Sequence, residues 1–160
     1  MIAPPRCLAP DDTVAGFDCG HESFDRWLTR RARPSERQRT AVTYVAADAD
    51  RLVGYYCLSA HSVARASVGG GWLASNAPGP IPAFLLGRLA ADRSWQGRGL
   101  GWSLLRDAVV RAAEASAVLG GPRPRGRPDR RRRGRLLPPL RLPPFPGLPG
   151  RLYLPTGSAA

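Results

Sequence analysis

One stretch of the sequence combines glycines with a cation where a helix is expected to begin. It reads Asp92-Arg-Ser-Trp-Gln-Gly-Arg-Gly-Leu-Gly101 and follows an apolar segment. The free N–H groups of a first helical turn and the helix dipole favour an anion, and glycines let that anion approach the backbone closely. Arg98 adds a positive charge. The pattern therefore predicts a binding site for a pyrophosphate group.

Two other phosphate-binding motifs fit this turn poorly. The P-loop requires a lysine, and this chain has none because all 24 of its Lys and Arg residues are arginines. The dinucleotide-binding fingerprint has another glycine spacing, and it needs an acidic residue about 20 positions later that is missing here. The plain alternative is a glycine-rich turn between a strand and a helix that serves structure alone.

The residues on either side of the turn predict the elements that hold it. Residues 83–91 form a nearly continuous apolar run, which is typical of a central strand. From about 99 to 119, apolar residues recur at helical spacing and predict a long helix. The expected inner stripe of this helix is Leu100, Leu104, Ala108 and Ala112, with Leu105, Val109 and Val118 alongside.

The preceding part of the chain predicts a helix and a β-hairpin. Apolar residues at helical spacing predict a helix over about 21–33, with Pro34 just beyond its end. Two apolar runs, 40–47 and 52–60, flank an Asp-Ala-Asp turn and predict the hairpin.

The histidines and cysteines are expected to have structural roles. His21 and His61 are predicted to lie in turns or at the surface, and Cys57 in the core. The three cysteines show no paired spacing, so neither a disulfide framework nor a metal site is expected.

Several segments together are similar to a known enzyme family. The motif Gln96-x-x-Gly99-x-Gly101, which follows Leu86-Gly-Arg-Leu-Ala90, resembles the acyl-CoA signature of the GNAT superfamily of N-acetyltransferases. Over about residues 10–120 the chain resembles the GNAT toxins of bacterial toxin–antitoxin modules. The further segments that carry this second likeness are Phe17-Asp-Cys-Gly20, Leu52-Val-Gly-Tyr-Tyr56 and Asp92.

The resemblance implies a fold and a co-substrate. The implied fold is GNAT-like α/β, with a mixed, mostly antiparallel central sheet flanked by helices and an irregular Pro/Arg-rich C-terminal tail. The implied co-substrate is acetyl-CoA, whose pantetheine arm would pair with the β-strand backbone and whose pyrophosphate would lie in the glycine-rich turn. The residues expected to bind it are Leu89, Ala90, Gln96, Gly97, Arg98, Gly99, Leu100 and Gly101.

The toxin branch of the family implies an acceptor and partners. Its members acetylate the amino group of aminoacyl-tRNA and are silenced by a ribbon-helix-helix antitoxin; a homodimer is a further expectation. Clustered arginines could contact RNA phosphates, although a solvated helix face is the alternative. The candidates for RNA contact are Arg26, Arg30, Arg31 and Arg33. Two other functions stay open: acetylation of a small-molecule or protein amine, and non-catalytic RNA binding by the tail.

Charge and proline content divide the chain near residue 120. The net charge of the 160 residues is +12, and residues 121–160 hold ten arginines, one acid and 10 of the 17 prolines. We interpret 1–120 as the acetyl-CoA-binding domain and 121–160 as an atypical tail that can neither continue a helix nor supply a central strand. No apolar run is long enough to cross a membrane, so a bacterial cytoplasmic protein is expected.

The tail lacks a motif that the resemblance implies. In GNAT enzymes a tyrosine on a short helix commonly protonates the departing CoA thiolate, and this chain has Leu137 at that position. Written in high-GC codons and read one base later, residues 121–142 permit the missing strand and the motif A-F-Y-x-x-F-G-F. We therefore predict that about 121–142 is out of frame and that the frame returns before a closing strand at 151–155. The competing interpretation is an authentic basic arm that binds RNA.

Overall fold

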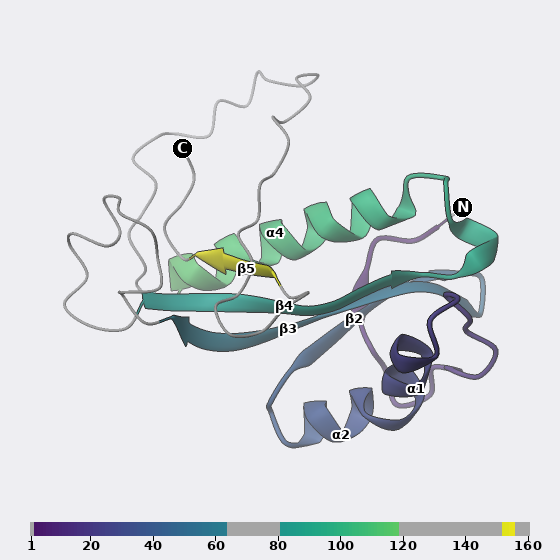
Figure 1. Cartoon of the computed structure of the whole chain (residues 1–160), viewed down its shortest axis with the longest axis horizontal. Coiled ribbons are helices and arrows are strands. Elements are labelled where there is room, and N and C mark those ends of the chain that lie inside the picture. Colours follow the sequence, from purple (N-terminus) through teal and green to yellow (C-terminus); the bar gives the residue numbers. More distant parts are fainter. Residues whose placement is uncertain (1, 64–80, 119–151, 156–160) are drawn as a thin grey trace.

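The strands of the protein form one antiparallel sheet with helices on both faces (Figure 1). The structure is a computed structural model that describes residues 2–63, 81–118 and 152–155. Its five strands lie in the order β1-β2-β3-β4-β5, and each neighbouring pair is antiparallel. They are β1 (Arg6–Cys7), β2 (Val42–Asp48), β3 (Arg51–Val63), β4 (Ile81–Ala91) and β5 (Leu152–Pro155).

The predicted hairpin and both later strands are confirmed. Strands β2 and β3 join through a tight turn in which Ala49 has a φ of 50°. Strand β4 then pairs with β3 over ten residue pairs, from Gly54↔Ala91 to Val63↔Ile81. The expected closing strand is β5, which pairs with β4 from Ala83 to Leu86. The expected irregular tail before it lies outside the described residues.

Helix α4 (Leu100–Val118) covers one face of the sheet (Figure 1). The predicted inner stripe is confirmed, because the four residues at its centre are buried at 0–6% exposure. Gly54 of β3 lets the helix approach, since a Cβ there would lie 2.9 Å from Leu104 Cδ1. Val118, expected beside the stripe, is instead 87% exposed, because it is the last residue of the helix and little packs against it.

Two short helices, α1 (Glu22–Arg30) and α2 (Ala32–Arg37), cover the opposite face. The prediction of one helix ending before Pro34 is wrong. The break falls at Arg31, whose φ of −120° is not helical, and Pro34 is the third residue of the second helix. A backbone N–H in a first helical turn has no intrahelical acceptor, so proline costs little at that place.

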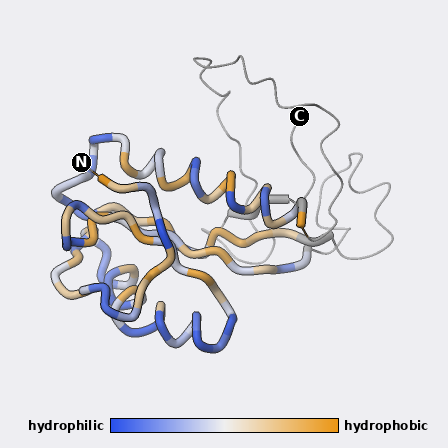
Figure 2. Tube along the Cα trace, turned by 180° about the vertical axis from the view of Figure 1, so that it is seen from behind, coloured by the Kyte–Doolittle hydropathy of each residue, from blue (hydrophilic) through white to orange (hydrophobic). Residues whose placement is uncertain are grey.

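The second core lies between these helices and the sheet. Leu28 and Ala32 are almost fully buried there. Tyr55 of β3 stacks on Trp27 at 5.9 Å between ring centroids, and its hydroxyl donates to Phe24 O at 2.9 Å. Figure 2 shows that many residues along α1 and α2 are hydrophilic. Among the described helices, none has the length and apolar character that a membrane crossing requires.

Candidate functional site

The glycine-rich turn joins the end of β4 to the start of α4. A 3-10 turn, η2 (Arg93–Trp95), comes first, and Gly97 and Gly99 follow with φ values of 73° and 80°. In this left-handed region a side chain is strained, which explains the two glycines. The first helical hydrogen bond runs from Ser103 N to Gly99 O at 3.1 Å. The N–H groups of residues 100–102 therefore have no intrahelical acceptor and can bind an anion.

The surface beside the turn is open. A Cβ built on Gly97, Gly99 or Gly101 would meet no atom within 4 Å. Two glycines elsewhere in the fold are packed instead: a Cβ on Gly54 would meet Leu104, and one on Gly87 would lie 3.0 Å from Cys57 Sγ. The glycines of the turn thus leave its backbone accessible to a ligand, as a pyrophosphate site requires.

Asp92 holds the first part of the turn in place. Its side chain is 2% exposed and accepts from Ser94 N at 3.0 Å, from Asp18 N at 3.2 Å and from Arg51 Nη2 at 3.1 Å. Burial by itself raises the pKa of this carboxyl, but the hydrogen bonds from Ser94, Asp18 and Arg51 outweigh burial and lower its pKa. The residue is therefore ionised at neutral pH and fixes the turn by charge-assisted hydrogen bonds.

Gln96 ties the turn to the N-terminal loop. Its Nε2 donates to Cys19 O at 2.8 Å and to Ala91 O at 3.0 Å. Arg93 N also donates to Asp18 O at 2.8 Å. The side chain of Gln96 thus binds protein carbonyls, which leaves its backbone as the part that could face a co-substrate.

Arg98 lies on the exposed side of the turn. Its Cζ is 5.1 Å from the centroid of the Trp95 ring, a cation–π distance. This contact holds the guanidinium at the surface of the turn, next to the open glycine positions.

Leu89 and Ala90 lie on β4 directly before the turn. They pair with Tyr56 and Tyr55 of β3 on one side. On the other side β5 reaches only as far as Leu86, so within the described residues no strand pairs with β4 at 87–91. A free backbone edge therefore leads from Leu89 and Ala90 into the turn. The eight residues predicted to bind acetyl-CoA thus lie along the end of β4, the turn and the start of α4, and the side chains of Ala90 and Leu100 are buried in the core.

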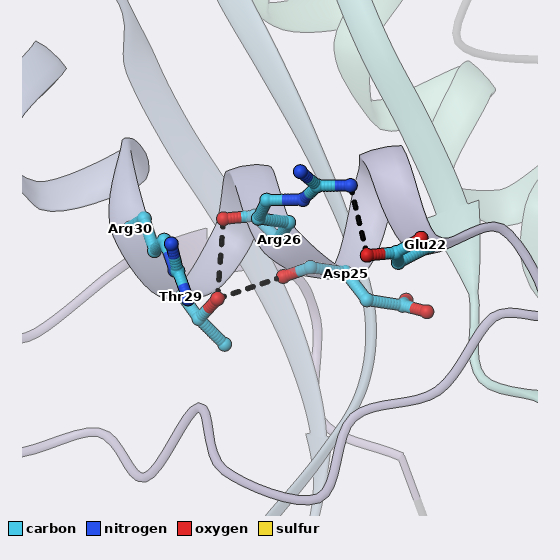
Figure 3. A pocket seen from close by; sticks show the side chains of 5 residues that line it. All are labelled: Glu22, Asp25, Arg26, Thr29 and Arg30. Carbon is cyan, nitrogen blue, oxygen red and sulfur yellow. Dashed lines mark hydrogen bonds and ion pairs between the residues drawn. The ribbon is translucent and has the colours of Figure 1, made fainter.

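The predicted RNA-binding arginines do not form one group. Arg26 and Arg30 line a shallow hollow on α1 together with Glu22, Asp25 and Thr29, and Arg26 pairs with Glu22 at 2.8 Å (Figure 3). The side chains of Arg30 and Arg31 are exposed. Arg33 is half-buried, and its Nη2 donates to Asp12 O at 2.5 Å. The guanidinium of Arg33 therefore serves the fold, whereas Arg30 and Arg31 present theirs to solvent.

Tyr55, Tyr56, Cys19 and Cys57 are buried within the fold, whereas Cys7 is exposed. The Tyr56 hydroxyl donates to Asp107, and burial raises the pKa of both Tyr55 and Tyr56. Burial also raises the pKa of the Cys19 thiol to about 11. His21 and His61 are exposed and Cys57 is buried, as predicted. Leu137, at the position expected for the proton donor, lies outside the described residues.

The residues that support the turn were not predicted from the sequence. Asp92 forms part of the family likeness, but no role was predicted for Asp92, Asp18 or Arg51. For Asp92 the sequence did contain a local signal, because the side chain of an Asp commonly accepts from the backbone N–H two residues later, here that of Ser94. No local signal links Asp18 or Arg51 to the turn, since they lie 74 and 41 residues from Asp92.

Solved structures similar to this fold are toxins. A complex of AtaT with acetyl-methionyl-tRNAfMet matches with a TM-score of 0.68 and 28% identity, covering 75% of this chain and 74% of that chain. A variant of AtaT bound to the C-terminus of the antitoxin AtaR and acetyl-CoA matches with a TM-score of 0.61 and 30% identity, covering 74% and 70%. No family model matches the chain.

The fold and the turn at the start of α4 define a GNAT-type N-acetyltransferase. Sequence comparison is more specific. The chain is 41% identical over 116 residues to a tRNA-acetylating toxin of Mycobacterium tuberculosis. The matched stretch covers 72% of this chain and 69% of the relative. The chain therefore belongs to the family of tRNA-acetylating toxins.

Proposed function

We propose that this protein transfers the acetyl group of acetyl-CoA to the amino group of an aminoacyl-tRNA and so stops translation. The observation that carries the proposal is the open glycine-rich turn at the start of α4, next to residues 87–91 of β4, which pair with no second strand among the described residues. An acetylated amino group can no longer attack a peptidyl ester, so the modified tRNA is lost to protein synthesis.

Acetyl-CoA fits the residues of this site. The N–H groups at the start of α4 and the guanidinium of Arg98 would hold the pyrophosphate. The backbone of Leu89 and Ala90 would pair with the amides of the pantetheine arm, as an added strand would. The three glycines that face open space leave room for the phosphates against the backbone.

The reaction itself is a direct transfer. The neutral amine attacks the carbonyl carbon of the thioester, the carbon–sulfur bond breaks, the amine loses a proton and the CoA thiolate gains one. No covalent enzyme intermediate is needed. Of the tyrosines that the structure describes, Tyr55 and Tyr56 donate their hydroxyl hydrogens within the core. The resemblance to GNAT enzymes would place the proton donor in the region of residues 121–142, where we propose a disrupted frame.

The partners follow from the same family. AtaT has been solved with the C-terminus of its antitoxin AtaR, and we propose that an antitoxin of the ribbon-helix-helix class silences this protein. The proposed location is the bacterial cytoplasm, where aminoacyl-tRNA and acetyl-CoA occur together.

An acetyl-transfer assay tests the proposal and the frame together. The chain as written and a version with 121–142 read one base later are each incubated with labelled acetyl-CoA and charged tRNA. We expect label on the aminoacyl group from the frame-corrected version and little from the chain as written. Robust transfer by the chain as written would contradict the proposed frame disruption. Label on a small amine or a protein, with none on tRNA, would contradict the proposed acceptor.

A further inference from the structure

An exposed tryptophan lies in the first turn of α4, beside the proposed pyrophosphate site. Among the described residues, four large apolar side chains are strongly exposed, and Trp102, at 50%, is the one aromatic among them. It has no aromatic or guanidinium partner within the described part of the chain. Trp102 is not among the residues that pack on the core beneath α4, so packing within the described residues does not account for this large apolar ring.

The position of Trp102 in the first turn of α4 favours a ring that lies over the glycine-rich turn. Side chains on a helix lean toward its N-terminus and cover the preceding turn. For Trp102 that preceding turn contains Arg98 and Gly99, the residues beside the open backbone. Trp95, the other tryptophan of this region, is half-buried, packs on the core and has Arg98 over its ring. Trp102 is therefore the ring that a ligand leaving the turn would meet.

The charges around Trp102 favour a polyanion. Arg106 lies four residues after Trp102 on the same side of a helix with 3.6 residues per turn, and Arg98 lies in the turn just before the helix begins at Leu100. Both are exposed. The nearest carboxylate on the helix, Asp107, faces the sheet, where it accepts from Arg111 Nε at 2.7 Å and from Tyr56. An exposed aromatic ring near the guanidinium of Arg98, which lies over Trp95, and near the exposed guanidinium of Arg106 suits a nucleoside that carries phosphate on both sides.

Acetyl-CoA has such a part, because its pyrophosphate continues into adenosine 3′-phosphate. We infer that Trp102 stacks on the adenine of acetyl-CoA and that Arg106 binds the 3′-phosphate, while Arg98 stays with the pyrophosphate. This inference rests on the proposed acetyl-CoA site and extends it along the outer face of α4. These contacts would make the protein bind acetyl-CoA more tightly than pantetheine phosphates that lack the adenosine.

The experiment compares two ligands by calorimetric titration of the full chain. Acetyl-CoA contains the adenosine, and acetyl-pantetheine 4′-phosphate lacks it. We expect Trp102→Ala to weaken acetyl-CoA binding about tenfold, in the range seen when a base loses its aromatic stacking partner, and to leave acetyl-pantetheine phosphate unchanged. Trp102→Phe should keep most of the affinity. Val110→Ala, which alters an exposed apolar residue two turns further along α4, is the matched control and should change neither ligand.

A third ligand tests the role of Arg106. Acetyl-dephospho-CoA, which lacks the 3′-phosphate, should bind the unaltered protein several-fold more weakly than acetyl-CoA, and Arg106→Ala should remove that difference. If acetyl-CoA binds and Trp102→Ala binds it equally well, the stacking is overturned and the proposed function stands. If neither acetyl-CoA nor acetyl-pantetheine phosphate binds the protein, the proposed co-substrate site is overturned, and this inference with it.

Discussion

The side chain of Gln96 donates to the carbonyl of Cys19 at 2.8 Å, across 77 residues of sequence. The side chain of Gln96 thus points into the protein and holds the glycine-rich turn, the proposed acetyl-CoA site, against the N-terminal loop. Its second bond, to Ala91 O at 3.0 Å, ties the same turn to the end of β4. Two hydrogen bonds of the Gln96 side chain therefore fix the turn. Anion binding by the turn would then depend on Gln96 even if its side chain does not contact the anion.

Loss of the two Gln96 side-chain hydrogen bonds should make the turn less stable. We expect Gln96→Ala to lower the free energy of unfolding by about 1–2 kcal/mol, because two partly exposed hydrogen bonds are lost, and to weaken acetyl-CoA binding as well. Chemical denaturation and calorimetric titration measure the two effects. Gln38→Ala is the control, because Gln38 is exposed and its side chain makes no hydrogen bond within the described residues. Equal stability of Gln96→Ala and the parent would contradict this role of Gln96.

A second prediction concerns Asp92 and pH. The pKa of Asp92 is lower in the folded protein than in the unfolded chain, so its ionised form stabilises the fold. This stabilisation is present in full above the unfolded pKa of about 4 and is lost as the pH falls through the lower folded pKa. We expect Asp92→Asn to cost about 2–3 kcal/mol at pH 7, since hydrogen bonds to a buried charge are lost.

The measurement is denaturant unfolding of the parent and of Asp92→Asn at pH 7 and at about pH 3. The difference between the two proteins should shrink at the lower pH. Asp50→Asn, at an exposed position of the β2–β3 turn, should behave like the parent at both values. A difference that stays constant with pH would show that packing, and not the charge of Asp92, stabilises the turn.

Much of this architecture could be predicted from local sequence. The stripe of Leu100, Leu104, Ala108 and Ala112 follows directly from helical periodicity, and the hairpin follows from two apolar runs around a turn. The break at Arg31 could not be predicted in this way, because a proline can end a helix or occupy the first turn of the next one. The pairs Gln96–Cys19 and Asp92–Asp18 depend on the folded sheet and leave no local pattern.

The glycines of the turn allow a sharper test of the proposed site. Gly101 lies within α4, has no positive φ and faces open space, so it tolerates a side chain. Gly101→Ala should keep the fold and most of the binding. Gly101→Asp should keep the fold too, because an acid near a helix N-terminus is favourable, but it should abolish acetyl-CoA binding by repelling the pyrophosphate. Calorimetric titration, with circular dichroism to check the fold, measures the difference.

Gly99→Glu should also abolish acetyl-CoA binding, but this substitution has two effects that the titration cannot separate. Gly99 has a φ of 80°, so a side chain there strains the backbone as well as blocking the ligand. If Gly101→Asp bound acetyl-CoA like the parent, the turn would not be the pyrophosphate site.

Arg98 should contribute less than the backbone of the turn. We expect Arg98→Ala to weaken acetyl-CoA binding by about 1–2 kcal/mol, because one charge-assisted contact at a solvated position is removed. The loss should diminish at high salt, since exposed charges are screened. Arg37→Ala, on the exposed side of α2, is the control for a simple change of net charge. A loss that does not respond to salt would assign Arg98 a packing role through Trp95 instead.

Arg30 and Arg31 should affect tRNA binding, whereas Arg33 should affect the stability of the fold. Arg30 and Arg31 are exposed, so Arg30→Ala and Arg31→Ala should weaken tRNA binding and reduce its salt dependence by about one counterion each, with no change in stability. Arg33 donates to Asp12 O, so Arg33→Ala should lower the midpoint of thermal unfolding. Filter binding of charged tRNA at several salt concentrations and thermal unfolding measure the two properties. Unchanged tRNA affinity in the Arg30 and Arg31 variants would contradict an RNA-binding surface at these two arginines, and the Arg33 guanidinium is held by the loop at Asp12.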